Sequence, residues 1–258
     1  ADSASEYFGV IELLDAFIKE VAAICDAVGA KRRSYKKIML SLDEWNVWYK
    51  THKIEHMRKP GWPEAPPLIE EVYNAEDALI VGGALIAILN NADRVKTACL
   101  AQLVNVIGPI MTETGGAAWR QTIFHPFALA SKYGHGRVLR TVSDSPSYSA
   151  KTFPEIPYLY ATVIDNPADG TTTVIALNRS LSDNLEVDIE LRGLGAERSL
   201  VAATEIHHAN LKAVNTKDAP NTVAPKTNAD VAIEGETVRV KLKPASFNVI
   251  VTKAAQPN

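Results

Sequence analysis

The pattern of apolar residues changes near Leu139, and this change limits the possible folds more than any other feature of the chain. Before it, long segments with apolar residues three and four positions apart alternate with short apolar runs, the order expected of helices and strands in a parallel sheet or barrel. After it, short segments of β-branched or alternating residues are separated by turn residues such as Asp169-Gly170, a pattern typical of antiparallel sheets. We therefore predict an α/β part over residues 1–138 and an all-β part over residues 139–258.

The first part is predicted to run helix, strand, helix, strand, helix. The expected elements are a helix over Ser5–Val28 that ends at Gly29, a strand over Lys37–Asn46, a helix over Leu68–Asn91 entered through Pro66-Pro67, a strand over Val95–Ile107 and a helix over His125–Tyr133. Both strands are apolar almost throughout, which suits a parallel sheet covered on both faces. Because two strands cannot form such a sheet alone, we expect the C-terminal part of a (β/α)8 TIM barrel, with most of the barrel absent from this chain. A missing N-terminal portion is then expected to cover the apolar faces left open.

The second part is expected to form an antiparallel β-sandwich of the jelly-roll kind. Strands are predicted over Tyr158–Asp165, Thr171–Asn178, Leu185–Leu191, Thr204–His207, Thr237–Leu242 and Phe247–Thr252. The polar, proline-containing stretch Asn210–Asp230 is predicted to be a surface loop. Earlier in the chain, Gly82-Gly83 lies inside a helical pattern, which indicates a close-packing site.

Charge and cysteine usage narrow the classes of function. The formal net charge of −3 over 258 residues gives no electrostatic reason to expect nucleic acid or an anionic membrane as a partner. No stretch approaches the roughly 18 uninterrupted apolar residues of a membrane span. Cys25 and Cys99 each lie in an apolar stretch, so we expect buried free thiols and a reducing compartment, the cytoplasm. His52 and His56 have the spacing of a helical metal pair, but no helix is predicted there and no metal or organic cofactor is expected.

The end of the first predicted strand is the first place to look for catalytic residues. In a barrel, active residues occupy the C-terminal ends of strands, where Asp43 and Glu44 lie. Because successive strand side chains point to opposite faces, one of the two is expected to face a substrate while the other turns into the wall. An adjacent pair cannot supply the two carboxyls, about 5–5.5 Å apart, of a retaining glycosidase. For that chemistry the sequence thus offers one carboxylate here, and the second carboxyl must come from elsewhere. On position alone, an Asp-Glu pair at a strand end is more often a solvated strand edge than a catalytic pair.

Three segments carry a specific resemblance. They are Leu-Ser-Leu-Asp-Glu-Trp-Asn-Val-Trp-Tyr at 40–49, Ala-Pro-Pro-Leu-Ile-Glu-Glu-Val-Tyr-Asn-Ala-Glu-Asp-Ala-Leu at 65–79, and Asn-Ala-Asp-Arg-Val-Lys-Thr-Ala-Cys-Leu-Ala-Gln-Leu-Val-Asn-Val-Ile-Gly-Pro-Ile at 91–110. In this order and spacing they resemble the α-L-arabinofuranosidases of glycoside hydrolase family 51. The resemblance covers most of the α/β part, and the terminal β part fits the architecture of that family.

The resemblance implies Glu44 as the nucleophile that forms a covalent arabinosyl-enzyme. It also implies Trp48 as a wall of the sugar subsite and Gln102 as a hydrogen-bonding contact, and we expect Asn46 among the substrate-binding residues. Gln102 suits buried backbone groups equally well, because an amide both donates and accepts, and Trp45 is expected to pack within the barrel. The acid/base of the family is a Glu that follows an Asn on an earlier strand. Since no residue here matches it in that context, we expect it on a preceding segment.

Three further side chains are weaker candidates. Glu113 is the other attractive carboxylate in a loop after a strand, and we expect a surface or supporting role for it. Trp62 and Trp119 are placed in loops that would rim the site, where they either grip the substrate or anchor the loops.

The expected function is release of terminal α-L-arabinofuranosyl residues from arabinoxylan, arabinan or arabino-oligosaccharides by a retaining hydrolase, which the resemblance predicts to be a homo-oligomer. The alternative is a non-catalytic carbohydrate-binding or structural protein in which the β part does the work. That alternative calls for an exposed aromatic surface. The few aromatics after residue 150 lie mostly in strand patterns that face inward: Phe153, Tyr158, Tyr160 and Phe247.

Overall fold

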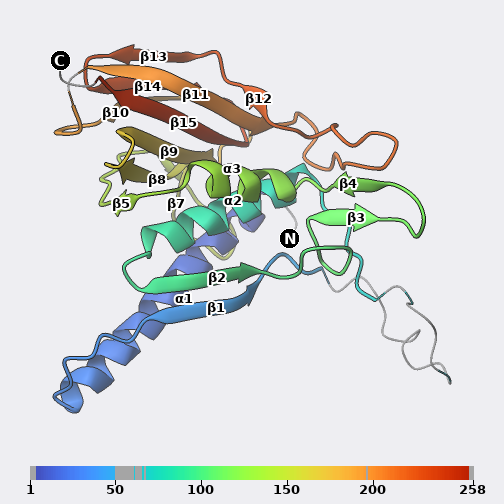
Figure 1. The fold of residues 1–258 in the computed structure, drawn as a ribbon, viewed down its shortest axis with the longest axis horizontal. Helices are drawn as coiled ribbons and strands as arrows, with labels where there is room; N and C mark the ends of the chain where they lie inside the picture. The colour runs from blue at the N-terminus through green and yellow to red at the C-terminus, as the bar shows by residue number, and fades with distance from the viewer. Residues whose placement is uncertain (1–3, 50–60, 62–65, 67, 196, 256–258) are drawn as a thin grey trace.

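The computed structural model describes residues 4–49, 61, 66, 68–195 and 197–255, and its first part is α/β (Figure 1). In chain order this part contains α1 (Ala4–Lys31), β1 (Leu40–Trp45), α2 (Ala75–Asn90), β2 (Val95–Leu100), β3 (Ile110–Thr112), β4 (Ala118–Arg120) and α3 (Phe124–Tyr133). β1 and β2 pair in parallel, whereas β3 and β4 form a short antiparallel hairpin. The predicted helices and the two predicted strands occur in the predicted order, but the β3–β4 hairpin between β2 and α3 was not predicted.

The second part is antiparallel throughout. Its strands are β5 (Arg137–Leu139), β6 (Ser147–Tyr148), β7 (Ile156–Pro157), β8 (Leu159–Asn166), β9 (Thr171–Asn178), β10 (Leu185–Glu190), β11 (Arg198–His207), β12 (Lys226–Thr227), β13 (Val231–Glu234), β14 (Thr237–Leu242) and β15 (Ser246–Ala254). One sheet has the order β12-β11-β15-β9-β8-β5 and a second has the order β10-β14-β13. The chain as described is thus a mixed α/β structure with antiparallel sheets.

The two antiparallel sheets share one apolar core. Along β14, Val238, Val240 and Leu242 are buried, while the residues between them are exposed. This alternation gives the strand one apolar face, which packs against Val174 and Ile250 of the six-stranded sheet. β14 at this position needs only one apolar face, whereas β9 and β15, which are central in the large sheet, are buried on both faces.

Helix α2 lies between the six-stranded sheet and the β1–β2 pair (Figure 1). Every residue from Ala75 to Ile88 is buried, as expected of a helix that is apolar on all sides. On one side Leu79 and Ile86 join the core of the large sheet, and on the other Ile88 packs near β1 and β2. The helix therefore connects the strands of the first part to the β part.

The predicted close-packing role of Gly82-Gly83 is confirmed. A Cβ atom on Gly82 would lie 2.4 Å from the ring of Phe247 on β15, and one on Gly83 would lie 2.1 Å from Cδ1 of Ile11 on α1. Both distances are far below an ordinary contact, so glycine at these positions lets α2 approach its neighbours.

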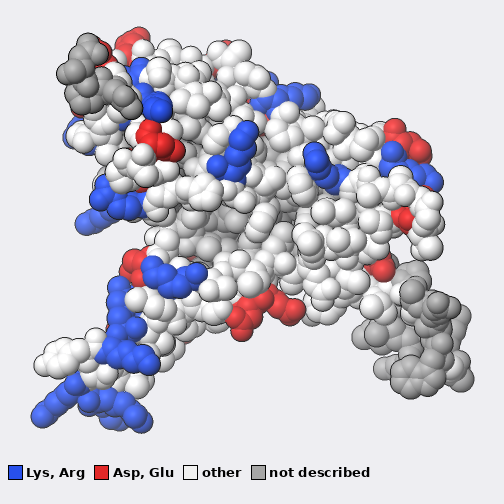
Figure 2. Space-filling view, viewed as in Figure 1, with Lys and Arg blue, Asp and Glu red and all other residues white. Residues whose placement is uncertain are grey.

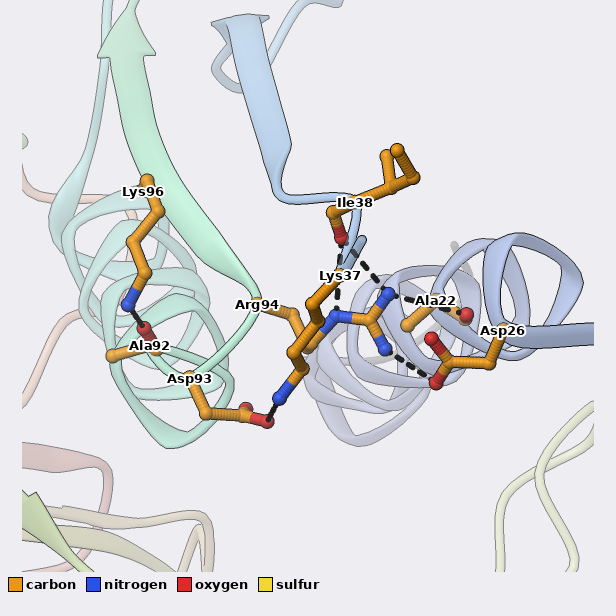
Figure 3. Close-up of polar contacts among 8 residues, drawn as sticks. All are labelled: Ala22, Asp26, Lys37, Ile38, Ala92, Asp93, Arg94 and Lys96. Carbon is orange, nitrogen blue, oxygen red and sulfur yellow. Dashed lines mark hydrogen bonds and ion pairs between the residues drawn. The ribbon is translucent and has the colours of Figure 1, made fainter. Parts of the chain in front are cut away.

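Arg94 ties the N-terminal ends of β1 and β2 to α1 (Figure 3). Its buried guanidinium donates to the carbonyl of Ile38 at 2.9 Å and pairs with Asp26 of α1 at 2.6 Å. The same side chain reaches the carbonyl of Ala22, and its own carbonyl accepts from Leu40 N–H at 2.8 Å. A guanidinium has five donors in a planar fork, so this one side chain can join α1 to the starts of β1 and β2.

Two predicted helix boundaries are wrong. α2 begins at Ala75 rather than after Pro66-Pro67, because Asn74 and Asp77 form a capping box in which each side chain accepts from the backbone N–H of the other residue. α1 continues through Gly29 to Lys31. The helix ends instead in a Schellman motif, in which Arg33 takes the left-handed conformation (φ 52°). Its N–H donates to the carbonyl of Ala30, and Ser34 N–H donates to the carbonyl of Gly29.

Three other expectations need correction. The second strand ends at Leu100 instead of Ile107. Cys25 and Cys99 are free, as predicted, but Cys25 is only half-buried and Cys99 is exposed, because it lies on a strand face that the described helices do not cover. Asn210–Asp230 is only partly a surface loop, since Val223 and Asn215 within it are buried.

One side of α1 leaves apolar side chains exposed. Leu13, Phe17 and Ile24 are each more than half exposed, which is consistent with the expectation that a further portion of protein covers this helix. Lys and Arg side chains gather at the C-terminal end of α1 and just after it (Figure 2). None of the helices in the described part of the chain is long and apolar enough to span a membrane.

Candidate active site

A β-bulge at the end of β1 determines how Glu44 is presented. Leu42 pairs with Ala98 and Trp45 pairs with Leu100, so three steps along β1 match two steps along β2. The extra residue breaks the alternation of side chains. Asp43 and Glu44 are consequently both exposed, and the prediction that one of them turns into the wall is wrong.

Glu44 stands at the C-terminal end of a parallel strand with its carboxylate open to solvent. Among the described residues it makes no side-chain hydrogen bond or ion pair, whereas Asp43 accepts a 2.5 Å hydrogen bond from Ser41. Acidic side chains are visible on the surface at the tip of β1 (Figure 2). Both carboxylates are thus exposed, and the role of Glu44 as the nucleophile stays a prediction.

Trp45 and Trp48 have different surroundings. Trp45 packs with Leu85 of α2 and with Phe127 of α3, its ring centroid 6.5 Å from that of Phe127, which confirms the expected packing role. Trp48 is 49% exposed. An exposed indole can offer its apolar face to a sugar ring, so Trp48 keeps the surface that the predicted subsite wall requires.

Asn46 joins the end of β1 to the segment after β2. Its side-chain amide donates to the carbonyls of Ala101 at 2.7 Å and Ile107 at 2.6 Å, and its carbonyl oxygen accepts from Val47 N–H at 2.8 Å. Both amide hydrogens are therefore used within the protein. Contact of Asn46 with substrate stays a prediction, with one remaining acceptor position as the part able to serve it.

Gln102 lies next to this junction. Ala101 N–H donates to the carbonyl of Trp45 at 3.1 Å, so the ends of the two parallel strands remain adjacent. Gln102 follows directly and is exposed, which excludes the alternative that its amide satisfies buried backbone groups. Glu44 near the end of β1, and Trp48 and Gln102 just after the ends of β1 and β2, thus all lie in exposed positions at the C-terminal edge of these strands.

Tyr7, Tyr49 and Asp77 form a hydrogen-bonded cluster that the sequence did not reveal, in which Asp77 is fully buried and Tyr49 is 41% exposed. Tyr49 and Tyr7 both donate to Oδ1 of Asp77, the latter at 3.1 Å. Burial, followed by the hydrogen bond to Asp77, raises the pKa of Tyr49, and burial raises the pKa of Asp77 itself. The spacing of Asn74 and Asp77 before an apolar run was the available signal, because it is that of a capping box.

The weaker candidates lie elsewhere. Glu113 is exposed and pairs with Lys217 at 3.1 Å, in keeping with the expected surface role. Trp119 is half-buried on β4. Trp62, His52 and His56 fall outside the described residues. Within the described part of the chain, no group of three or more His, Cys, Asp or Glu side chains could hold a metal ion.

Comparisons with known proteins identify the family. Residues 43–246 match the family described as the alpha-L-arabinofuranosidase C-terminal domain. The chain is 46% identical over 240 residues to intracellular exo-α-(1→5)-L-arabinofuranosidase 1 of Bacillus subtilis, covering 93% of this chain and 47% of that protein. It is 41% identical over 247 residues to an exo-α-(1→6)-L-arabinofuranosidase of Bifidobacterium longum, again covering 93% of this chain and 47% of that protein.

A solved structure agrees with these sequence matches. A family 51 α-L-arabinofuranosidase from Bifidobacterium longum matches with a TM-score of 0.88 and 33% identity, covering 97% of this chain and 49% of that one. The chain therefore belongs to the α-L-arabinofuranosidases of glycoside hydrolase family 51, as a counterpart of their C-terminal portion. It spans about half the length of the curated relatives it matches.

Proposed function

We propose that this chain is the C-terminal half of a retaining exo-α-L-arabinofuranosidase. In this proposal residues 1–138 form the end of a (β/α)8 barrel, with β1 and β2 as neighbouring barrel strands, and residues 139–258 form a β-sandwich domain. The parallel pairing of β1 and β2 and the shared core of the two antiparallel sheets support this division.

Glu44 acts as the nucleophile. Its ionised carboxylate attacks the anomeric carbon of a terminal arabinofuranosyl residue while a second carboxyl group, a Glu on a preceding segment, protonates the leaving oxygen. Water then releases arabinose from the covalent intermediate, with the same Glu acting as base. Trp48 forms a wall against the sugar ring, Gln102 hydrogen-bonds a hydroxyl, and no cofactor takes part.

The observation that carries the proposal is the presentation of Glu44. The bulge leaves this carboxylate exposed at the C-terminal end of β1, just before the segment that bears Trp48 and next to the end of β2. Strand ends are where barrel enzymes hold their reactive groups. A solvated strand edge would account for the exposure of Glu44, but not for its occurrence within the matched family segment.

The substrates and partners follow from the relatives. Proteins similar to this chain are named as exo-acting arabinofuranosidases for α-(1→5) and α-(1→6) linkages, so arabinan, arabinoxylan and arabino-oligosaccharides are the proposed substrate class. We propose that the enzyme is cytoplasmic and forms a homo-oligomer. In each subunit, the N-terminal portion of the same enzyme completes the barrel.

The test is hydrolysis of 4-nitrophenyl α-L-arabinofuranoside by the longest polypeptide that carries this chain, beside its Glu44→Gln and Asp43→Asn variants. Glu44→Gln should lose at least about a thousandfold in kcat, because it removes the nucleophile, whereas Asp43→Asn should keep most of the activity. NMR should show the first-formed sugar with retained configuration. Full activity in Glu44→Gln would refute the assignment, and sugar binding without hydrolysis in any form would favour the binding-module alternative.

A further inference from the structure

The segment Asn46–Tyr49 leads from the bulge of β1 to Trp48, and hydrogen bonds hold it from several elements. The Asn46 amide reaches two carbonyls in the segment after β2. The Tyr73 hydroxyl donates to the carbonyl of Val47 at 2.7 Å, and the Tyr49 hydroxyl donates to Asp77 of α2. Hydrogen bonds thus hold the residues on both sides of Trp48: Asn46 and Val47 before it and Tyr49 after it.

Packing holds one side of this segment and leaves the other side open. Val47 packs against the core clusters that contain Leu79 and Leu85. On the open side lies an apolar pocket of about 380 Å³, lined also by α1 and α2 residues such as Leu14 and Ile80. Close packing is what normally holds side chains in one place, so hydrogen bonds from residues next to Trp48 add a restraint on the side where packing is absent.

Asp77 is the fixed end of this arrangement. It is fully buried in the first turn of α2, and its second oxygen, Oδ2, accepts from Asn74 N–H at 2.8 Å. Tyr7 of α1 also donates to Oδ1. Because the helix and its cap hold the Asp77 carboxylate independently of Tyr49, Asp77 can fix the position of the Tyr49 hydroxyl.

We propose that Asp77 is a positioning residue for the sugar subsite and acts through Tyr49, whose hydroxyl holds the Trp48 indole in the orientation that packs against the arabinofuranosyl ring. This rests on the proposed function, because it takes Trp48 to be the wall of that subsite. Neither Asp77 nor Tyr49 needs to touch the substrate. Their effect is to reduce the number of orientations that Trp48 samples before the sugar arrives.

The chain offers a matched pair of variants. Tyr49→Phe and Tyr7→Phe each remove one hydroxyl from the same oxygen of Asp77, but only Tyr49 belongs to the segment that carries Trp48. Tyr49→Phe should lower kcat/KM on 4-nitrophenyl α-L-arabinofuranoside by about tenfold, mostly through a raised KM, because a loosened wall weakens binding in the ground and transition states alike. Tyr7→Phe should change kcat/KM by less than about twofold, while the two variants lower the thermal midpoint by similar amounts.

A double-mutant cycle tests the route through Trp48. In a Trp48→Ala background, Tyr49→Phe should have almost no further effect on kcat/KM, because the side chain that it positions is gone. Equal effects of Tyr49→Phe and Tyr7→Phe, or an undiminished effect of Tyr49→Phe in the Trp48→Ala background, would overturn this inference while leaving the proposed function intact. A wild-type protein that hydrolyses no arabinofuranoside would overturn both.

Discussion

Replacing Gly83 with alanine should destabilise the protein even though alanine is the better helix former. In the interior of a helix, Gly→Ala ordinarily gains about 1 kcal/mol. The new methyl would lie 2.1 Å from Cδ1 and 2.8 Å from Cγ1 of Ile11, whereas ordinary contact begins at 3.4 Å. Ile11 is 2% exposed, so it has little space into which to turn, and overpacking of this kind costs about 1–3 kcal/mol. The net change expected is a loss of up to about 2 kcal/mol.

The assay is urea unfolding followed by circular dichroism, with Gly29→Ala as the matched control. Gly29 is also helical, but the nearest atom to an added Cβ is 3.9 Å away, so this variant should be neutral or more stable than wild type. Ile11→Val removes the atom nearest to the new methyl, and it should therefore cost less in the Gly83→Ala background than alone, by about 0.5 kcal/mol or more. A raised urea midpoint for Gly83→Ala, or strict additivity with Ile11→Val, would refute the packing argument.

Two further predictions concern charged groups in the α/β part. Arg94→Ala should lower stability by about 3 kcal/mol in the same unfolding assay, since it leaves buried carbonyls without donors. Lys37→Ala, which removes an exposed ion pair with Asp93, should change it by less than about 1 kcal/mol; equal losses would contradict the role given to Arg94. Burial, and then the charge of Arg120, lowers the pKa of His125 from 6.5 to about 4, so His125 folds in its neutral form. Its contribution to the free energy of unfolding is fully present above pH 6.5 and is lost as the pH falls toward 4, by about 2 kcal/mol after allowance for solvent screening. A His125→Asn variant with the same pH dependence of stability as wild type would contradict this.

Local patterns were enough to locate several strands and helices. Thr171–Asn178 and Thr237–Leu242 have the predicted boundaries. A run of β-branched residues in the first, and the alternation of apolar and charged residues in the second, are properties of the segment itself. The helix around His125–Tyr133 was likewise predicted to within one residue. The shortest strands were missed, such as β12 with two residues, because so few residues carry no periodic signal and pair only where a neighbouring strand passes.

At the candidate site, too, the sequence identified individual residues but not the contacts that they make. The segment match identified Glu44, Trp48 and Gln102, and all three are exposed at or just after the C-terminal ends of β1 and β2. The sequence could not show that Asn46 spends both amide hydrogens on the protein, or that Tyr49 binds Asp77, because their partners lie between 28 and 61 positions away along the chain.

By itself, then, the sequence determined the two kinds of structure in the chain and the carboxylate at the end of the first strand. These are local properties, encoded in the spacing of apolar residues and in short segments. Only the tertiary structure decided that a bulge exposes Asp43 and Glu44 together, and that Asp77 anchors the segment carrying Trp48. A bulge is defined by the register between two strands, and the hydrogen bond between Tyr49 and Asp77 requires two elements that are distant in the sequence to approach each other. Neither therefore exists until the chain has folded.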